Sequence, residues 1–204
     1  MTQTLSFEDQ RRIGAAIKAV EAKTSGEIVC VVARAASDYM TYAIAWSALA
    51  ALAAPWFLIA FTQLSTQRIF LIQVLVFSAL FFVLSGSSLR HRLVPRGVRR
   101  AQAHRAAMEQ FMIRGMARKE NRASILIFVS LAEHYVRIIA DDGIAAKVDD
   151  SVWREAVDAL LANIQDGEIA EGFTIAVEKC GGVLAEHFPP GDKQDELPDR
   201  IYVI

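Results

Sequence analysis

The sequence predicts an α/β protein, a three-layer α/β/α sandwich with a small mixed sheet that is interrupted by a two-helix transmembrane hairpin. Two observations carry this prediction. Helix-like and strand-like patterns alternate outside residues 39–89, as they do in layered α/β domains. Residues 39–89 themselves are apolar almost throughout, and Arg68 is the one charged residue among them.

The segment before the hairpin has the pattern of one helix followed by one strand. Ser6 is a typical N-cap residue, and Glu8 and Asp9 favour the first turn of a helix. Residues 27–35 (EIVCVVARA) are β-formers in a run too continuous for a half-exposed strand, which predicts a strand buried on both faces. The expected apolar stripe of the helix consists of Phe7, Ile13, Ile17 and Val20.

Two uncharged segments, Thr41–Thr62 and Ile69–Gly86, predict spans across a bilayer, which takes about 20 apolar residues. The second segment reaches this length with the help of residues 87–89. They are apolar on every side, and the remaining domain of about 150 residues is too small to cover them as core helices. The six residues 63–68 between them allow only a tight hairpin. The alanine-rich first span can pack against the second span or against another copy of the chain, so a homo-oligomer stays open.

A cluster of arginines follows the second span. Residues 39–108 contain seven arginines and no Asp or Glu, so the rest of the chain carries a charge of −8 within a total of −1. Positive residues favour the cytoplasmic side of a membrane, which predicts that both termini and the α/β domain are cytoplasmic. Five of these arginines are expected to bind anionic lipid headgroups, and we call them the arginine collar: Arg90, Arg92, Arg96, Arg99 and Arg100. Because the collar adjoins a span, lipid is favoured over nucleic acid.

The segment after the collar predicts the second half of the same domain. A helix is expected over residues 101–119, with Ala107, Phe111 and Met112 towards the core. Residues 124–131 and 135–140 predict two strands in an antiparallel hairpin. An even number of spans returns the chain to the same side, so the strand at 27–35 can join this hairpin in one sheet.

The last part of the chain predicts two helices and a tail. Asp141-Asp142-Gly143 is expected to form a turn, and Asp150 or Ser151 to cap a helix that runs to Gln165. A second helix is expected over residues 168–186, where Gly181-Gly182 indicates close packing. Residues 201–204 either add an edge strand or dock on the sheet. The expected divisions are 1–38, the first part of the domain; 39–89, the hairpin; 90–105, the juxtamembrane collar; 106–190, the second part of the domain; and 191–204, the tail.

Three stretches of this sequence resemble one known family. They are VEAKTSGEIVCVVA, the run ENRASILIFVSLAEHYVRIIADDGI, and the helix SVWREAVDALLANIQDGEIAEG with LAEHFPP after it. Their order and spacing resemble the TPM domain, a family named for a thylakoid-lumen phosphatase-like protein, a photosystem II repair protein and a worm acetylcholine-receptor modulator. The resemblance implies an α/β/α sandwich, in agreement with the pattern of elements.

The resemblance also implies several kinds of function. Some members are weak acid phosphatases, some bind a divalent cation such as calcium through acidic loop residues, and some are auxiliary or assembly factors. This chain departs from the better-known members because residues 1–10 lack a signal-peptide pattern and because the spans interrupt the domain. It resembles a bacterial inner-membrane branch with an inserted transmembrane hairpin, which places it in the inner (plasma) membrane as a multi-pass protein.

The candidate chemistry is acidic. Phosphate-binding, serine-hydrolase and metalloprotease motifs are missing, so catalytic residues stay unknown. Glu27, Asp141 and Asp142 match the acidic positions of the family pattern and are candidate ligands for calcium or magnesium, with turn and cap chemistry as the alternative. Further residues considered for a site are Glu133, Arg114, Arg122 and Arg137, and the two cysteines, Cys30 and Cys180, are expected to be buried apolar residues.

Three functions remain open, of which one is a lipid-headgroup sensor built on the arginine collar. The missing catalytic set favours a non-enzymatic module that binds, assembles or regulates at the inner membrane. The alternative is a divalent-metal-dependent phosphatase that hydrolyses phosphomonoesters. The expected partners are membrane lipids and a membrane protein, with no nucleic acid, and no cofactor beyond the divalent cation is expected.

Overall fold

The computed structural model describes residues 5–86, 94–116, 123–191, 198 and 200–204. The chain divides into two compact units, of which one consists of Met1–Ala36 with Ala101–Ile204 and the other of Ser37–Arg100. The first unit is an α/β domain assembled from two stretches of sequence. The second unit is the apolar hairpin that separates them in the chain.

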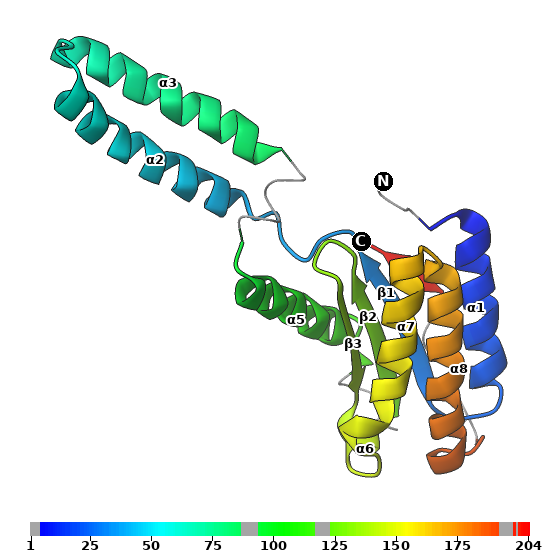
Figure 1. Cartoon of the computed structure of the whole chain (residues 1–204). Coiled ribbons are helices and arrows are strands. Elements are labelled where there is room, and N and C mark those ends of the chain that lie inside the picture. The colour runs from blue at the N-terminus through cyan, green and yellow to red at the C-terminus, as the bar shows by residue number, and fades with distance from the viewer. Residues whose placement is uncertain (1–4, 87–93, 117–122, 192–197, 199) are drawn as a thin grey trace. The chain divides into compact units, whose positions relative to one another are not determined.

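The α/β domain contains a four-stranded mixed sheet in the order β3-β2-β1-β4 (Figure 1). β1 (Glu27–Ala33) and β2 (Ser124–Ser130) run parallel, and β3 (Tyr135–Ala140) pairs antiparallel with β2. Both β1 and β2 are buried at every position, as their continuous apolar runs predicted. β4 (Ile201–Val203) pairs parallel with the free side of β1, so the tail adds an edge strand.

Helices cover both faces of this sheet and produce three layers, which confirms the predicted fold class (Figure 1). Among the described elements, three helices cover one face and one helix covers the other. The first group consists of α1 (Phe7–Glu21), α7 (Arg154–Asp166) and α8 (Ile169–His187), and the opposite helix is α5 (Arg96–Ile113).

Alternate side chains of β1 separate the two cores. Ile28 and Cys30 enter the larger core, which α1, α7 and α8 cover, and Val29 and Val31 enter the smaller core against α5. Phe128 of β2 is fully buried in the smaller core. This alternation is what a strand buried on both faces requires.

The first helix begins as predicted, but one of its apolar residues is exposed. The Ser6 hydroxyl accepts a hydrogen bond from Asp9 N–H, and the Asp9 carboxylate accepts one from Ser6 N–H, which completes a capping box. Phe7 is 77% exposed and was wrongly assigned to the core stripe. It lies about a quarter turn away from the direction that Ile13 and Ile17 define.

The helix after the hairpin begins and ends earlier than predicted. α5 starts at Arg96 rather than at residue 101 and ends at Ile113, and the described residues that follow include Gly115 with a φ of 71°. Its buried stripe includes Ala107 and Phe111, as expected, whereas Met112 is 61% exposed and was wrongly placed in the core. Met112 is the neighbour of Phe111 in sequence and therefore points about 100° away from it around the helix.

The region after β3 contains two short helices instead of a simple turn. Asp141 is the N-cap of α6 (Asp142–Ala145). The 3₁₀ helix η2 (Asp150–Trp153) then precedes α7, and its N-cap is Asp149 rather than the predicted Asp150 or Ser151. The Asp149 carboxylate accepts a hydrogen bond from Ser151 N–H at 2.8 Å, so the cap lies one turn before the helix proper.

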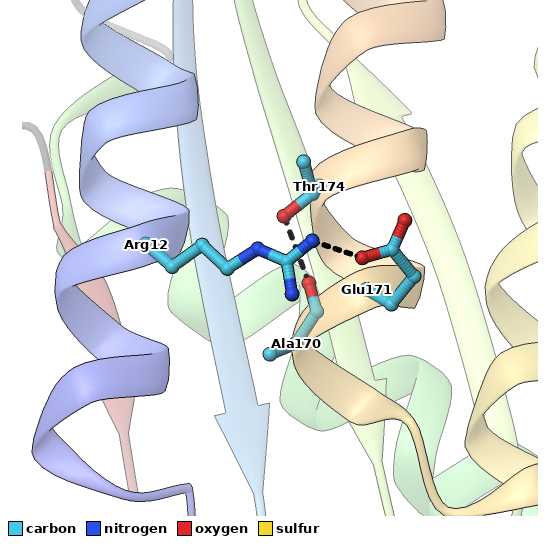
Figure 2. A network of polar contacts seen from close by, with 4 residues as sticks. All are labelled: Arg12, Ala170, Glu171 and Thr174. Atoms are coloured by element: carbon cyan, nitrogen blue, oxygen red, sulfur yellow. Dashed lines mark hydrogen bonds and ion pairs between the residues drawn. The ribbon is translucent and has the colours of Figure 1, made fainter.

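α1 and α8 pack side by side, and one polar contact joins their outer surfaces. Arg12 reaches across to the carboxylate of Glu171, while Thr174 uses its hydroxyl within α8 to donate to the Ala170 carbonyl at 2.9 Å (Figure 2). The Arg12 and Glu171 side chains are 57% and 39% exposed, so this ion pair contributes less than about 1 kcal/mol to stability. The apolar contacts beneath it hold the helices together.

The second unit consists of two apolar helices, α2 (Met40–Phe61) and α3 (Thr66–Ser85), that lie side by side (Figure 1). Within the described residues these are the two helices long and apolar enough to cross a membrane. Only 11% of the most apolar stretch of α2 and none of that of α3 is buried, so neither resembles the core helix of a soluble protein. Large side chains such as Trp56 and Phe61 are more than four-fifths exposed.

Candidate functional site

The acidic residues predicted to bind a cation lie at the end of the sheet where β1 and β2 begin and β3 ends. Glu27 is the first residue of β1 and pairs in register with Ser124, the first residue of β2. Asp141 follows β3, and its backbone N–H donates to the Ser124 carbonyl at 2.9 Å. Ser124 therefore lies between two acidic residues that are far apart in sequence, at backbone positions about 10 Å from each other.

Asp141 is the most unusual of these residues. Its side chain caps α6 by accepting a hydrogen bond through Oδ1 from Asp142 N–H at 2.7 Å. Its Oδ2 atom is buried and has no hydrogen-bond partner among the described residues. Burial of a carboxylate oxygen without a partner costs free energy, so the capping role alone does not explain this position.

The turn before β1 is tightly held and determines where Glu27 enters the sheet. The Thr24 hydroxyl accepts from Gly26 N–H at 3.0 Å and donates to the Phe188 carbonyl at 2.5 Å. A side chain at Gly26 would meet a Leu184 methyl group at 2.9 Å and the Ala123 carbonyl oxygen at 3.1 Å. Only glycine allows β1, α8 and the start of β2 to approach this closely.

The described residues do not form a complete cation site here. Calcium and magnesium take about six or more oxygen ligands. In the part of the chain that the structure describes, no group of three or more His, Cys, Asp or Glu side chains is arranged to hold a metal ion. Glu27 and Asp141 are each 5% exposed, whereas Asp142 is exposed. The geometry therefore gives no support to the predicted calcium or magnesium site at Glu27, Asp141 and Asp142.

Glu133 lies at the opposite end of the sheet. Its carboxylate accepts hydrogen bonds from Ala36 N–H at 3.1 Å and from the Ser130 hydroxyl. Ser124 and Ser130 are the two ends of β2, about 20 Å apart, so Glu133 does not share a site with Asp141. It holds the segment that leaves β1.

Of the arginines considered for phosphoryl binding, the two that the structure describes, Arg114 and Arg137, are not brought together. Arg137 is exposed on β3 at one edge of the sheet. The Arg114 guanidinium lies 3.4 Å from the centre of the Tyr202 ring in β4, at the other edge about 14 Å away, and Arg200 lies 4.9 Å from the same ring. Burial lowers the pKa of Arg114. The nearby Tyr202 acts to raise this pKa, and the positive charge of Arg200 lowers it further. Arg122 is outside the described residues.

Part of the arginine collar is described. Arg96 and Arg100 are exposed and Arg99 is partly buried, all near the start of α5. Arg90 and Arg92 lie outside the described residues. Binding of the collar to lipid headgroups stays a prediction.

One buried acid was missed in the sequence. Glu21, at the end of α1, is 8% exposed, and its Oε1 accepts a hydrogen bond from Ile28 N–H at 2.7 Å. The signal was its spacing, because Glu21 continues the buried positions Ile13 and Ile17 at intervals of four residues. An acid on a core-facing stripe indicates a buried hydrogen bond.

The predicted burial of the two cysteines is confirmed. Cys30 and Cys180 are free thiols in the larger core with no exposed surface. Burial raises the pKa of Cys180 to about 12 and raises the pKa of Cys30 well above its ordinary value. Neither thiol is therefore suited to nucleophilic chemistry at neutral pH.

A shallow pocket of about 340 Å³ opens between the start of α7 and α8. The ion pair between Glu155 and Lys179, 3.2 Å long, lies at this pocket, and Val152 and Val183 supply apolar lining. Its polar lining residues are Ser151 and the mutually paired Glu155 and Lys179, so the charged groups at the pocket are engaged with each other.

Comparison with known proteins supports the resemblance noted in the sequence. Residues 93–183 match the sequence model of the TPM domain, a range that contains β2 and β3 but not β1 or β4. The NMR structure of the BA42 protein from the psychrophilic bacterium Bizionia argentinensis is similar, with a TM-score of 0.61 and 20% identity over 100% of this chain and 97% of that chain. This likeness concerns the fold alone. No curated protein matches the chain.

Proposed function

Because the chain carries a TPM domain and two helices apolar enough to span a membrane, we propose that it is a membrane-anchored module of the bacterial inner membrane. The module binds a partner and thereby assists assembly or regulation. The observation that supports this proposal most is the position of the hairpin in the sequence. It is inserted between β1 and α5, within the α/β domain. An anchor of this kind is joined to the domain by two chain segments instead of one.

The length of these segments supports action close to the bilayer. Six residues, 34–39, join the end of β1 to the start of α2, and such a segment spans at most about 20 Å. A domain on a long flexible linker searches a large volume, whereas this domain acts within a short distance of its anchor. A membrane protein, a lipid surface or a second copy of the chain is the kind of partner that such a module meets.

The phosphatase alternative is not favoured by the geometry. Phosphoryl transfer needs a nucleophile or metal-bound water next to groups that stabilise the phosphoryl oxygens. Arg137 pairs in register with Phe128, which is four residues, or about 13 Å, along β2 from Ser124. The described arginine on β3 is therefore distant from the acidic end of the sheet.

Cation binding and hydrolysis distinguish the two functions. The full chain is purified in detergent and titrated with Ca²⁺ or Mg²⁺ by calorimetry, in parallel with the double variant Asp141→Asn/Asp142→Asn. Both proteins are then assayed for hydrolysis of a phosphomonoester. The proposal expects the wild type and the double variant to show the same hydrolysis. If the wild type hydrolyses the phosphomonoester and the double variant does not, the proposal is overturned.

Partner binding is tested in cells with a photo-crosslinking residue at Val152, in the shallow pocket, and with the same residue at the exposed Glu178 as a control. A discrete adduct in the membrane fraction that forms from Val152, not from Glu178, and persists in the Asp141→Asn/Asp142→Asn background supports a binding module.

The orientation of the anchor is tested separately. We propose that both termini and the α/β domain face the cytoplasm, as the arginine collar favours. In spheroplasts, a membrane-impermeant maleimide should label Gln63→Cys at the hairpin tip and leave Glu178→Cys unlabelled. The reverse pattern would place the domain outside.

A further inference from the structure

We propose that α5 is an amphipathic surface helix whose outward face lies in the interfacial region of an anionic lipid bilayer. The inference deepens the proposed function and rests on its membrane anchor. It assigns the lipid surface as a ligand of the α/β domain itself, beyond the two spans. The residues that carry it lie on α5 after the arginine collar.

The two sides of α5 are both partly apolar, which a helix on a water-exposed surface does not need. Ala103, Ala107 and Phe111 are buried against the sheet. On the outward half of the helix, Met108, Met112 and Ile113 are 39%, 61% and 76% exposed. A domain in water rarely gathers three large apolar side chains on one exposed surface without a use for them.

The charge of the helix indicates what covers this surface. α5 carries four arginines, Arg96, Arg99, Arg100 and Arg105, and a single acid, Glu109. Arg105 is exposed and precedes Met108 by three residues, so the two lie on the same side of the helix. Basic residues beside exposed apolar ones are typical of helices that lie on anionic membranes, where the long arginine side chain reaches the headgroups.

The position of α5 in the chain favours lipid over a protein partner. α5 follows α3 after ten residues, 86–95, which span at most about 35 Å. It is the next described helix after the second candidate span. Methionine-rich surfaces also bind proteins, so a protein partner is the competing occupant that the experiment must distinguish.

Environment-sensitive fluorophores on single introduced cysteines test the inference in the full chain. Met112→Cys probes the outward face of α5, and Glu178→Cys, exposed on α8, is the matched control on the other face of the sheet. Leu52→Cys, exposed on α2, tests the anchor itself. The native Cys30 and Cys180 are fully buried, so the label attaches to the introduced thiols.

The labelled proteins are placed in nanodiscs that contain phosphatidylglycerol and no other protein. Lipids with a spin label near the headgroup should quench the Met112 probe severalfold more than the Glu178 probe, and aqueous iodide should show the opposite order. If the Leu52 probe is quenched by lipid while the Met112 probe behaves like the Glu178 probe, the inference is overturned and the anchor stands. If the Leu52 probe is also exposed to water, the proposed anchor fails and the inference fails with it.

The role of negative lipid charge in the binding of α5 is tested separately. Quenching of the Met112 probe should fall severalfold in nanodiscs of phosphatidylcholine alone, and it should fall with Arg105→Gln but not with Arg11→Gln, which removes an exposed arginine on α1. Equal quenching in both lipids, unaffected by Arg105→Gln, would overturn the assignment of an anionic surface.

Discussion

Gly181 of α8 lies directly against Val20 of α1, where a Cβ atom on residue 181 would be 2.1 Å from Val20 Cγ1. Real contacts between carbon atoms are much longer, so only glycine permits this approach of the two helices. Gly182 faces open space, with nothing within 4 Å of the corresponding position. The sequence predicted close packing for the pair, and it is Gly181 that makes the contact.

Gly181→Ala is expected to destabilise the domain by about 1–3 kcal/mol, because the added methyl group forces α1 and α8 apart. Gly182→Ala is the matched control and should stabilise the domain by about 0.5–1 kcal/mol, since alanine has the higher helix propensity and meets no neighbour. Denaturant unfolding in detergent, followed by circular dichroism, measures both. Equal effects of the two substitutions would contradict the contact.

Glu21→Ala is expected to cost about 1.5–3 kcal/mol, because it leaves the buried Ile28 N–H without the carboxylate that accepts its hydrogen bond at 2.7 Å. Glu21→Gln keeps an oxygen acceptor at the same place and should cost clearly less. The same unfolding measurement separates them. If the two substitutions are equally harmful, the charge rather than the hydrogen bond matters.

Asp141→Ala is expected to cost about 0.5–2 kcal/mol, because it removes the Oδ1 acceptor that caps α6. Asp141→Asn retains that acceptor and replaces the unpaired Oδ2 by an uncharged group, so its cost should be smaller. Thermal unfolding is measured with chelator and with added Mg²⁺ or Ca²⁺. A cation that raises the melting temperature of the wild type and of neither variant would show that the Asp141 carboxylate binds the ion.

The two buried cysteines are expected to reduce stability at high pH. Burial raises the pKa of Cys180 from 9.0 to about 12, so above pH 9 the unfolded chain loses a proton that the folded chain keeps. The contribution to stability is therefore complete below pH 9 and is lost as the pH rises towards 12, at about 1.4 kcal/mol per pH unit. Cys180→Ala should flatten this slope, measured by denaturant unfolding across pH 8–11, and should leave the slope below pH 9 unchanged. An unaltered slope would mean that the thiol ionises in the folded protein.

Local patterns in the sequence predicted most elements because each depends on residues a few positions apart. Ser6 and Asp9 form the predicted start of α1, and the uncharged runs at 41–62 and 69–86 correspond to α2 and α3. The errors concern direction around a helix. Phe7 and Met112 are apolar and lie near the buried stripes, but rotation of about 100° per residue takes them away from the core.

The sequence by itself determined the class of this protein, its apolar hairpin, its basic segment and its resemblance to the TPM domain, since composition, periodicity and charge can be read along the chain. Only the tertiary structure decided that Ser124 lies between Glu27 and Asp141, that Arg114 and Arg137 lie at opposite edges of the sheet, and that the tail pairs with β1. Those relationships depend on strand order and register, which arise when segments distant in sequence pack together. The site predicted from acidic residues could therefore be assessed only once the sheet had been assembled.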